Sequence, residues 1–147
     1  MTARTLSPMR SARPFWQTGL LTIAAAIVAN LVARFLVELV VPLPAEFPPL
    51  AYWAIALFTL LGVGLGVLVY ALIGRFLARP NRVFTIVAVV ALVLSVIPNL
   101  QMLSNPAAVP LPPGTPAPTP TAALTLMLFH VIAASVTIWM LTQRKSS

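Results

Sequence analysis

Three polar residues lie within the first apolar stretch of the chain, and their spacing places them on one side of a helix. Asn30, Arg34 and Glu38 follow one another at intervals of four residues, the spacing of neighbours along one helix face. If this stretch crosses a membrane, an uncompensated charge at mid-bilayer costs about 2.5 to 3.5 kcal/mol even on a lenient insertion scale. We therefore expect the stripe to face other helices and not lipid, which makes it the first candidate site.

Two interpretations of this stripe stay open. In the functional one, it is a polar pathway or binding site that opens to the outside, where Arg34 attracts an anion or keeps Glu38 ionised and Glu38 carries protons. In the structural one, Arg34 and Glu38 form an ion pair within the helix that neutralises itself, while the Arg34 side chain extends outward. Arg before Glu is the weaker orientation for such a pair, which keeps the functional interpretation open.

His130 is the only histidine of the chain. We expect it about nine residues into the fourth apolar helix, near the depth of Asn30. One histidine cannot supply a metal site with several ligands or a bis-histidine haem, so we expect no metal and no cofactor. It would serve as a proton relay or as a donor to a bound head group, because imidazole changes its charge near neutral pH. Alternatively, it holds helices together through a hydrogen bond to Asn30, Ser95 or a backbone carbonyl.

Glycines of the second apolar stretch are expected to pack helices. Residues 61–66 (LGVGLG) superficially resemble a dinucleotide fingerprint, but that motif needs a preceding strand, a turn and an exposed helix N-terminus. Gly62 and Gly66 instead form a G-x-x-x-G face, continued by Tyr70 and Gly74, along which a neighbouring helix approaches closely. We expect this face to pack inside the bundle, with homodimerisation as the alternative.

Small and polar residues also follow one face of the third and fourth stretches. Ser95 and Asn99 lie on such a face of the third stretch, and His130 and Thr137 lie on one of the fourth. The bundle interior is therefore expected to be weakly polar at mid-depth, with Ser95 among the packing residues. The chain shows no nucleophile with its base, no pair of carboxylates at a shared depth and no H-E-x-x-H motif. We accordingly expect no catalytic residue and no enzyme.

Four apolar stretches position these residues. A membrane helix needs about 20 mostly apolar residues, and the segments at about 16–41, 51–76, 83–103 and 121–142 meet that length. We expect Pro98 to kink the third helix. The proline-rich residues 104–120 are expected to be an extended or disordered outer loop, because proline lacks an N–H and opposes helix continuation. The expected fold class is all-α, a four-transmembrane-helix bundle in one membrane domain, 1–147.

The composition indicates that the bilayer is the solvent of this chain. Of its 147 residues, 60% are hydrophobic and 7% charged, and the mean hydropathy is +1.00, far from the balance of a soluble globular protein. Nine Lys and Arg stand against two Asp and Glu, but most of the basic residues gather in short clusters between apolar stretches, which argues against nucleic acid as a partner. The absence of cysteine excludes disulfides and thiol redox chemistry.

The basic clusters predict the orientation of the chain in the membrane. The three clusters are Arg4, Arg10 and Arg13 at the N-terminus, Arg75, Arg79 and Arg82 in the second connection, and Arg144 and Lys145 at the C-terminus. Short loops rich in Lys and Arg stay on the cytoplasmic side. All three clusters share one side only if the number of spans is even, so we expect a multi-pass protein of the cell membrane with both termini cytoplasmic. Although the N-terminus resembles a signal peptide, its apolar run is too long for one, so we expect a helix there.

Three segments resemble a known family. They are residues 70–84 (YALIGRFLARPNRVF), 94–98 (LSVIP) and 130–134 (HVIAA). Together with four helices, a Gly-rich second helix and an R-x-x-x-R-P-x-R turn, they are similar to short bacterial integral membrane proteins classed as a domain of unknown function. The resemblance covers about residues 16–141. It implies a four-helix membrane fold and brings no assigned activity, substrate or catalytic residue.

Two functions are compatible with the sequence. The first is a non-enzymatic structural, regulatory or accessory role in the lipid bilayer, with a second copy or another membrane protein as a partner. The alternative is a small transporter with a polar pathway along Asn30, Arg34, Glu38 and His130. In size and helix count the chain is similar to small multidrug-resistance transporters, which place an essential acid inside the first helix. Glu38 lies instead toward the outer edge, with Arg34 one turn below it, which argues against proton-coupled cation export.

Overall fold

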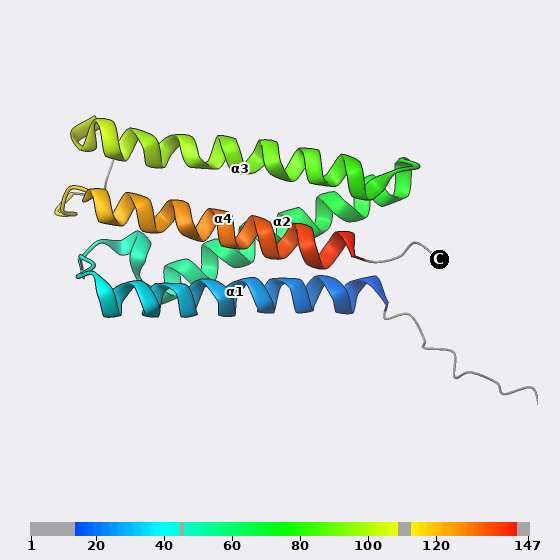
Figure 1. Cartoon of the computed structure of the whole chain (residues 1–147), viewed down its shortest axis with the longest axis horizontal. Coiled ribbons are helices and arrows are strands. Elements are labelled where there is room, and N and C mark those ends of the chain that lie inside the picture. The colour runs from blue at the N-terminus through cyan, green and yellow to red at the C-terminus, as the bar shows by residue number, and fades with distance from the viewer. Residues whose placement is uncertain (1–13, 45, 109–112, 144–147) are drawn as a thin grey trace, which may run out of the picture.

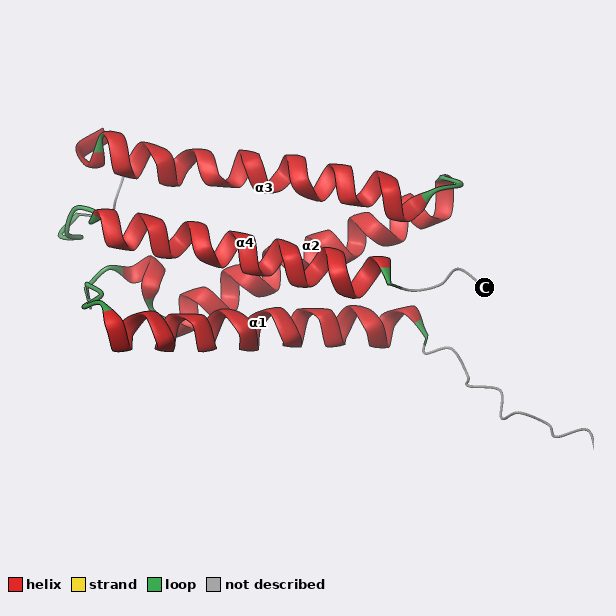
Figure 2. Cartoon of the chain, viewed as in Figure 1, coloured by secondary structure: helices red, strands yellow, loops and turns green. Residues whose placement is uncertain are grey.

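Four long helices make up the protein in a computed structural model (Figure 1). They are α1 (Phe15–Val40), α2 (Tyr52–Phe76), α3 (Pro80–Ser104) and α4 (Pro120–Thr142), with short 3-10 helices η1 (Pro48–Leu50) and η2 (Pro106–Ala108) in two connections. The structure describes residues 14–44, 46–108 and 113–143, and within these ranges every regular element is a helix (Figure 2). Each long helix is long and apolar enough to cross a membrane. The predicted all-α four-helix fold is therefore confirmed.

The helices alternate in direction, so their ends gather at two opposite ends of the molecule (Figure 1). The start of α1, the α2–α3 turn and the end of α4 form what we call the basic end. The connections that contain η1 and η2 form the loop end. α4 packs against both α1 and α3, while α1 packs against α2. α4 thus completes the bundle by lying between the first and third helices.

Two groups of buried side chains hold the two ends together. At the loop end, Phe47 and Leu50 of the α1–α2 connection are buried against both α2 and α4. At the basic end, Tyr70 of α2, Phe84 of α3 and Leu141 of α4 pack together, with the Tyr70 and Phe84 rings edge to face at 5.1 Å between centroids. Helices in lipid associate mainly through van der Waals packing and interhelical hydrogen bonds. Such groups are therefore the main apolar contribution to the bundle.

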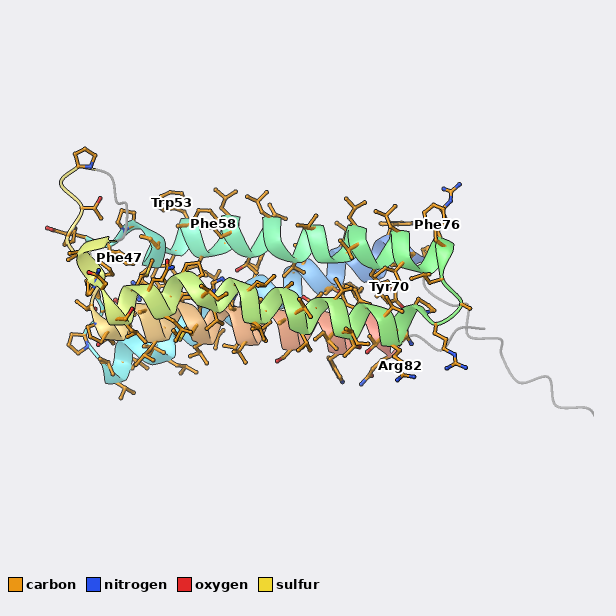
Figure 3. All side chains as sticks on the ribbon, turned by 90° about the horizontal axis from the view of Figure 1, so that it is seen from above. Phe47, Trp53, Phe58, Tyr70, Phe76 and Arg82 are labelled. Atoms are coloured by element: carbon orange, nitrogen blue, oxygen red, sulfur yellow. The ribbon has the colours of Figure 1, made fainter. Side chains whose placement is uncertain are left out.

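Large apolar side chains also cover the outer surface. Trp53 and Phe58 extend outward from α2, and both are mostly exposed (Figure 3). Comparable exposed residues occur on α1, α3 and α4. Monomeric soluble proteins rarely expose contiguous apolar surface on this scale, whereas lipid tails solvate it. The surface therefore agrees with a chain that crosses the bilayer several times.

Proline shapes the starts of two helices. α3 begins at Pro80, before the expected start at about residue 83, because proline at the first helical position loses no hydrogen bond and has the φ that a helix needs. α3 then continues through Pro98 to Ser104. α4 begins at Pro120 and is capped by the Thr119 hydroxyl, which accepts a hydrogen bond of 3.2 Å from the Ala122 backbone N–H.

The proline-rich connection contains a helical turn that the sequence analysis did not predict. Residues Pro106–Ala108 form η2, so the prediction of extended or disordered chain is wrong there. The physical reason is that the fixed φ of proline also suits the first turn of a 3-10 helix. Gly114 has a φ of +82°, a conformation that glycine adopts without steric cost. Residues 109–112 of this connection lie outside the described residues.

The G-x-x-x-G face of α2 packs differently from the prediction. A Cβ added to Gly62 or Gly74 would meet no atom within 4 Å, so neither glycine lies against another helix of the chain. A Cβ on Gly66 would stand 3.4 Å from the Thr137 Cγ2 of α4, an ordinary van der Waals contact. The expectation that this whole face packs inside the bundle is corrected accordingly, because α2 turns Gly62 and Gly74 toward the outside.

A close approach between two helices occurs at a glycine that the sequence analysis missed. A Cβ added to Gly19 of α1 would lie 2.7 Å from the Val67 Cγ1 of α2. Real Cβ atoms essentially never come so close, and valine in a helix is held in one side-chain rotamer. Glycine at position 19 therefore allows α1 and α2 to touch near the basic end.

We predict that Gly19→Ala lowers the stability of the bundle by about 1 to 3 kcal/mol, the usual cost of an added group in a packed site. Thermal unfolding in detergent, followed by helical circular dichroism, measures this effect. Gly62→Ala is the matched control and should be neutral or slightly stabilising, because its added methyl group meets open space and alanine favours helix. Equal unfolding temperatures for the two variants would contradict the packing described above.

Candidate polar cluster at the loop end

Arg34 occupies the centre of the predicted stripe and is buried, with 6% of its surface exposed. Its Nε donates a hydrogen bond of 2.6 Å to the carbonyl oxygen of Leu50, the last residue of η1. Its Nη1 donates one of 2.7 Å to the Oε2 of Glu38, one turn further along α1. The guanidinium carbon also lies 4.7 Å from the centre of the Tyr52 ring, within reach of a cation–π interaction. Arg34 thus connects α1 with η1 and with the start of α2.

Glu38 completes a charge pair within α1. The Arg34 and Glu38 side chains form a salt bridge at 2.7 Å, and 46% of the Glu38 side chain is exposed. The same carboxylate oxygen accepts a hydrogen bond of 3.0 Å from the Tyr52 hydroxyl. Hydrogen bonds with charged partners are stronger than neutral ones, so the two donors hold the carboxylate in one place. This arrangement is the ion pair of the structural interpretation, despite the weaker order of Arg before Glu.

Asn30 lies one turn deeper and joins α1 to α2. Its Nδ2 donates a hydrogen bond of 2.9 Å to the Thr59 Oγ1, and both residues are buried. Its Oδ1 is buried as well and has no hydrogen-bond partner. A buried polar atom left unpaired costs about 1 to 3 kcal/mol. We use the name polar cluster for Asn30, Arg34, Glu38, Tyr52 and Thr59 together with the Leu50 carbonyl.

His130 makes its hydrogen bond within its own helix. Its Nδ1 lies 2.7 Å from the carbonyl oxygen of Leu126, and the side chain is half-buried. Of the three partners expected for it, the structure shows a backbone carbonyl. This bond stays inside α4, so it does not connect two helices as the prediction required.

The depth of His130 follows from how α2 and α4 lie against each other. Gly66 faces Thr137, and both helices run from the loop end to the basic end (Figure 1). Both helices rise by the same amount per residue. Thr59 precedes Gly66 on α2 by as many residues as His130 precedes Thr137 on α4, so His130 lies at about the level of Thr59. Thr59 is bonded to Asn30. His130 is therefore expected at about the depth of Asn30, and its hydrogen bond to Leu126 does not join it to the polar cluster.

Ser95, expected among the packing residues, bonds within α3. Its hydroxyl donates a hydrogen bond of 2.7 Å to the Leu92 carbonyl, and its own carbonyl accepts one of 3.2 Å from the Nδ2 of the buried Asn99. Hydroxyls and amides that bond to the preceding turn are common in helices. These bonds do not tie α3 to a neighbouring helix.

A second set of polar contacts, at the basic end, was missed by the sequence analysis. The Tyr70 hydroxyl donates a hydrogen bond of 2.7 Å to the Asn81 Oδ1. The Asn81 Nδ2 donates one of 2.9 Å to the backbone carbonyl of Thr142, at the end of α4. Asn81 thereby connects α2, α3 and α4. The carbonyls at the end of a helix lack partners within it, but nothing in the sequence shows which residue will reach them.

The chemistry that these residues support is limited. Among the described residues, no three His, Asp or Glu side chains come together to hold a metal ion. A shallow surface groove is lined by apolar residues, including Ala25 and Ala29 of α1 and Met140 of α4, and it includes no member of the polar cluster. The cluster offers one charge pair, whose carboxylate is half-exposed, and one unpaired amide oxygen, and these groups can form further hydrogen bonds.

We predict that Arg34→Met destabilises the protein by about 1 to 3 kcal/mol, because it leaves Glu38 and the Leu50 carbonyl without their charged donor. Glu38→Gln should cost less, since this side chain is half-exposed. The double variant should be more stable than the sum of the two single effects implies, by about 1 kcal/mol, because the residues are in direct contact. Thermal unfolding in detergent measures all three variants. Strictly additive effects would contradict a functioning ion pair.

Comparison with known proteins adds the family to this description. Neither the curated proteins nor the solved structures contain a match to the chain. Residues 10–147, nearly the whole chain, match a family of unknown function, DUF6069. The resemblance stated from segments 70–84, 94–98 and 130–134 is thereby confirmed, and with it the expectation that the family assigns no activity. The chain belongs to the family of unknown function DUF6069.

Proposed function

We propose that this multi-pass membrane protein is not an enzyme and has a structural, regulatory or accessory role. The pairing of Arg34 is the observation that carries the proposal. Its Nε and Nη1 both bond to acceptors within the chain, so the buried charge stabilises the loop end. A guanidinium used in this way is not free to attract a substrate anion.

In this proposal the polar cluster holds three successive elements, α1, η1 and α2, together. Arg34 belongs to α1, Leu50 to η1 and Tyr52 to the start of α2. Hydrogen bonds to charged groups contribute about 1.5 to 3 kcal/mol each, more than neutral ones. A transport pathway would need the Arg34 charge to exchange partners as a substrate passes. Its hydrogen bonds to Leu50 and Glu38 would then break in each transport cycle. The geometry therefore favours a static role for the charge pair.

The accessory role predicts a protein neighbour in the native membrane, which site-specific photo-crosslinking can identify. Suitable positions, one on each helix and all 56–62% exposed, are Val28, Leu65, Val93 and Leu124. We expect a discrete protein adduct from one or two of these positions, identified by mass spectrometry as a second copy or another membrane protein. The remaining positions are matched controls and should yield lipid adducts. Lipid adducts alone at all four positions would contradict the accessory role.

A small transporter is the second candidate, and one observation favours it. The unpaired Oδ1 of Asn30 and the half-exposed Glu38 lie on the same stripe, which suits a polar pathway entering from the loop end. Flux across proteoliposomes that Glu38→Gln or His130→Ala abolishes, while helical circular dichroism shows that the variant still folds, would replace the accessory role with this one.

We further infer that the basic end faces the cytoplasm and that the protein resides in the cell membrane. The support is that Arg75, Arg79 and Arg82 lie in the turn at that end, together with the start of α1 and the end of α4 (Figure 1). Positive residues in short loops are retained on the cytoplasmic side. The N-terminal and C-terminal basic clusters of the sequence lie outside the described residues.

Reporter fusions test this orientation. A reporter inserted after Leu43 or after Gly114, both in loop-end connections, should be found on the outer face of the membrane. A reporter inserted after Ala78, in the α2–α3 turn, is the internal control and should be cytosolic. The inference fails if the fusions after Leu43 and Gly114 are both cytosolic.

A further inference from the structure

The α2–α3 turn concentrates positive charge that no acidic side chain among the described residues neutralises. Arg75 lies in the last turn of α2, Arg79 directly precedes α3 and Arg82 lies in its first turn, and all three are exposed. Among the described residues, the one salt bridge is the pair in the polar cluster at the loop end.

The two acids of the chain are too far away to compensate this charge. Glu38 and Glu46 belong to the end of α1 and to the connection that follows it, at the loop end. The 25 residues of α2 separate them from the turn by about 37 Å, at 1.5 Å per residue. Charges are largely screened beyond about 8 Å at physiological ionic strength. The three guanidinium groups are therefore open to an external anion.

Apolar side chains stand beside these arginines. Phe76, 74% exposed, and Leu77 follow Arg75 directly, and the Arg75 guanidinium carbon lies 6.0 Å from the centre of the Phe76 ring. Phe76 and Arg82 extend from the same end of the molecule (Figure 3). Exposed aromatic and aliphatic groups next to basic ones fit the boundary between lipid headgroups and acyl chains. A free soluble anion would use only the charges.

The turn is also held in a defined position. Asn81, in the first turn of α3, bonds to both Tyr70 of α2 and the Thr142 carbonyl of α4. Pro80 begins α3 directly after Arg79. A binding surface that is ordered before its ligand arrives spends less free energy on ordering when it binds. The guanidinium group, with its planar arrangement of donors, is suited to phosphate oxygens.

We propose that residues 75–82 bind the headgroup of anionic phospholipids. Arg75, Arg79 and Arg82 contact the phosphate oxygens, and Phe76 and Leu77 lie among the first carbons of the acyl chains. The lipid partner follows from the combination of unneutralised charge with exposed apolar groups, and it is independent of the accessory role proposed above.

Lipid titration of the full chain in detergent, monitored by native mass spectrometry, tests the proposal. Phosphatidylglycerol should bind more tightly than phosphatidylcholine with the same acyl chains. Each of Arg75→Gln, Arg79→Gln and Arg82→Gln should weaken phosphatidylglycerol binding about five-fold, since one basic residue near an anionic surface contributes about that factor. These side chains are exposed, and an unchanged unfolding temperature will show that the variants fold.

Arg4→Gln is the matched control, because it removes the same charge at a position eleven residues before α1 begins. It should change phosphatidylglycerol binding by less than about two-fold. An equal loss in this variant would overturn the proposal in favour of bulk attraction to net charge. Inorganic phosphate, added in excess, should not displace the lipid. Full displacement would show that the turn binds a free anion, and equal binding of the two lipids would overturn the proposal, because the turn would then not select the anionic headgroup.

Discussion

The need to satisfy every backbone N–H and C=O without water governs this structure. In hydrocarbon an unpaired peptide group costs several kcal/mol, and a helix pairs these groups within one segment. Four continuous helices result, and even Pro98 lies within one of them. The side chains then divide by environment, with large apolar groups on the outside and a few polar ones turned inward. Asn30 and Arg34 are both buried on that inward surface, because there they find hydrogen-bond partners and the free-energy cost of placing them in the membrane is lowest.

Polar contacts and close packing then decide how the helices associate, since lipid tails are as apolar as the helices themselves. Each end of the bundle has a polar side chain that joins different elements. At the loop end Arg34 connects α1 to the Leu50 carbonyl, and at the basic end Asn81 connects Tyr70 to the Thr142 carbonyl. In both places a side chain pairs with a backbone carbonyl near the end of a helix, where such groups lack intrahelical partners.

The two ends of the bundle differ in charge, and each end therefore suits a different role. The loop end holds both acids, and its buried arginine is neutralised by Glu38. The basic end holds exposed arginines with an apolar neighbour, Phe76. Buried charge is thus used to stabilise the fold, while exposed charge remains for an external partner.

The sequence by itself determined the helices and the ion pair, because both are local. Span length is set by consecutive apolar residues, and residues four apart on a helix meet whatever lies around them. The tertiary structure alone decided that Arg34 also reaches Leu50, that Gly19 and not Gly62 is closely packed, and that Asn81 joins three helices. These outcomes depend on how each helix is rotated toward its neighbours. Helices that are apolar on nearly every side carry little periodic signal for that rotation, since lipid and protein interior favour the same residues.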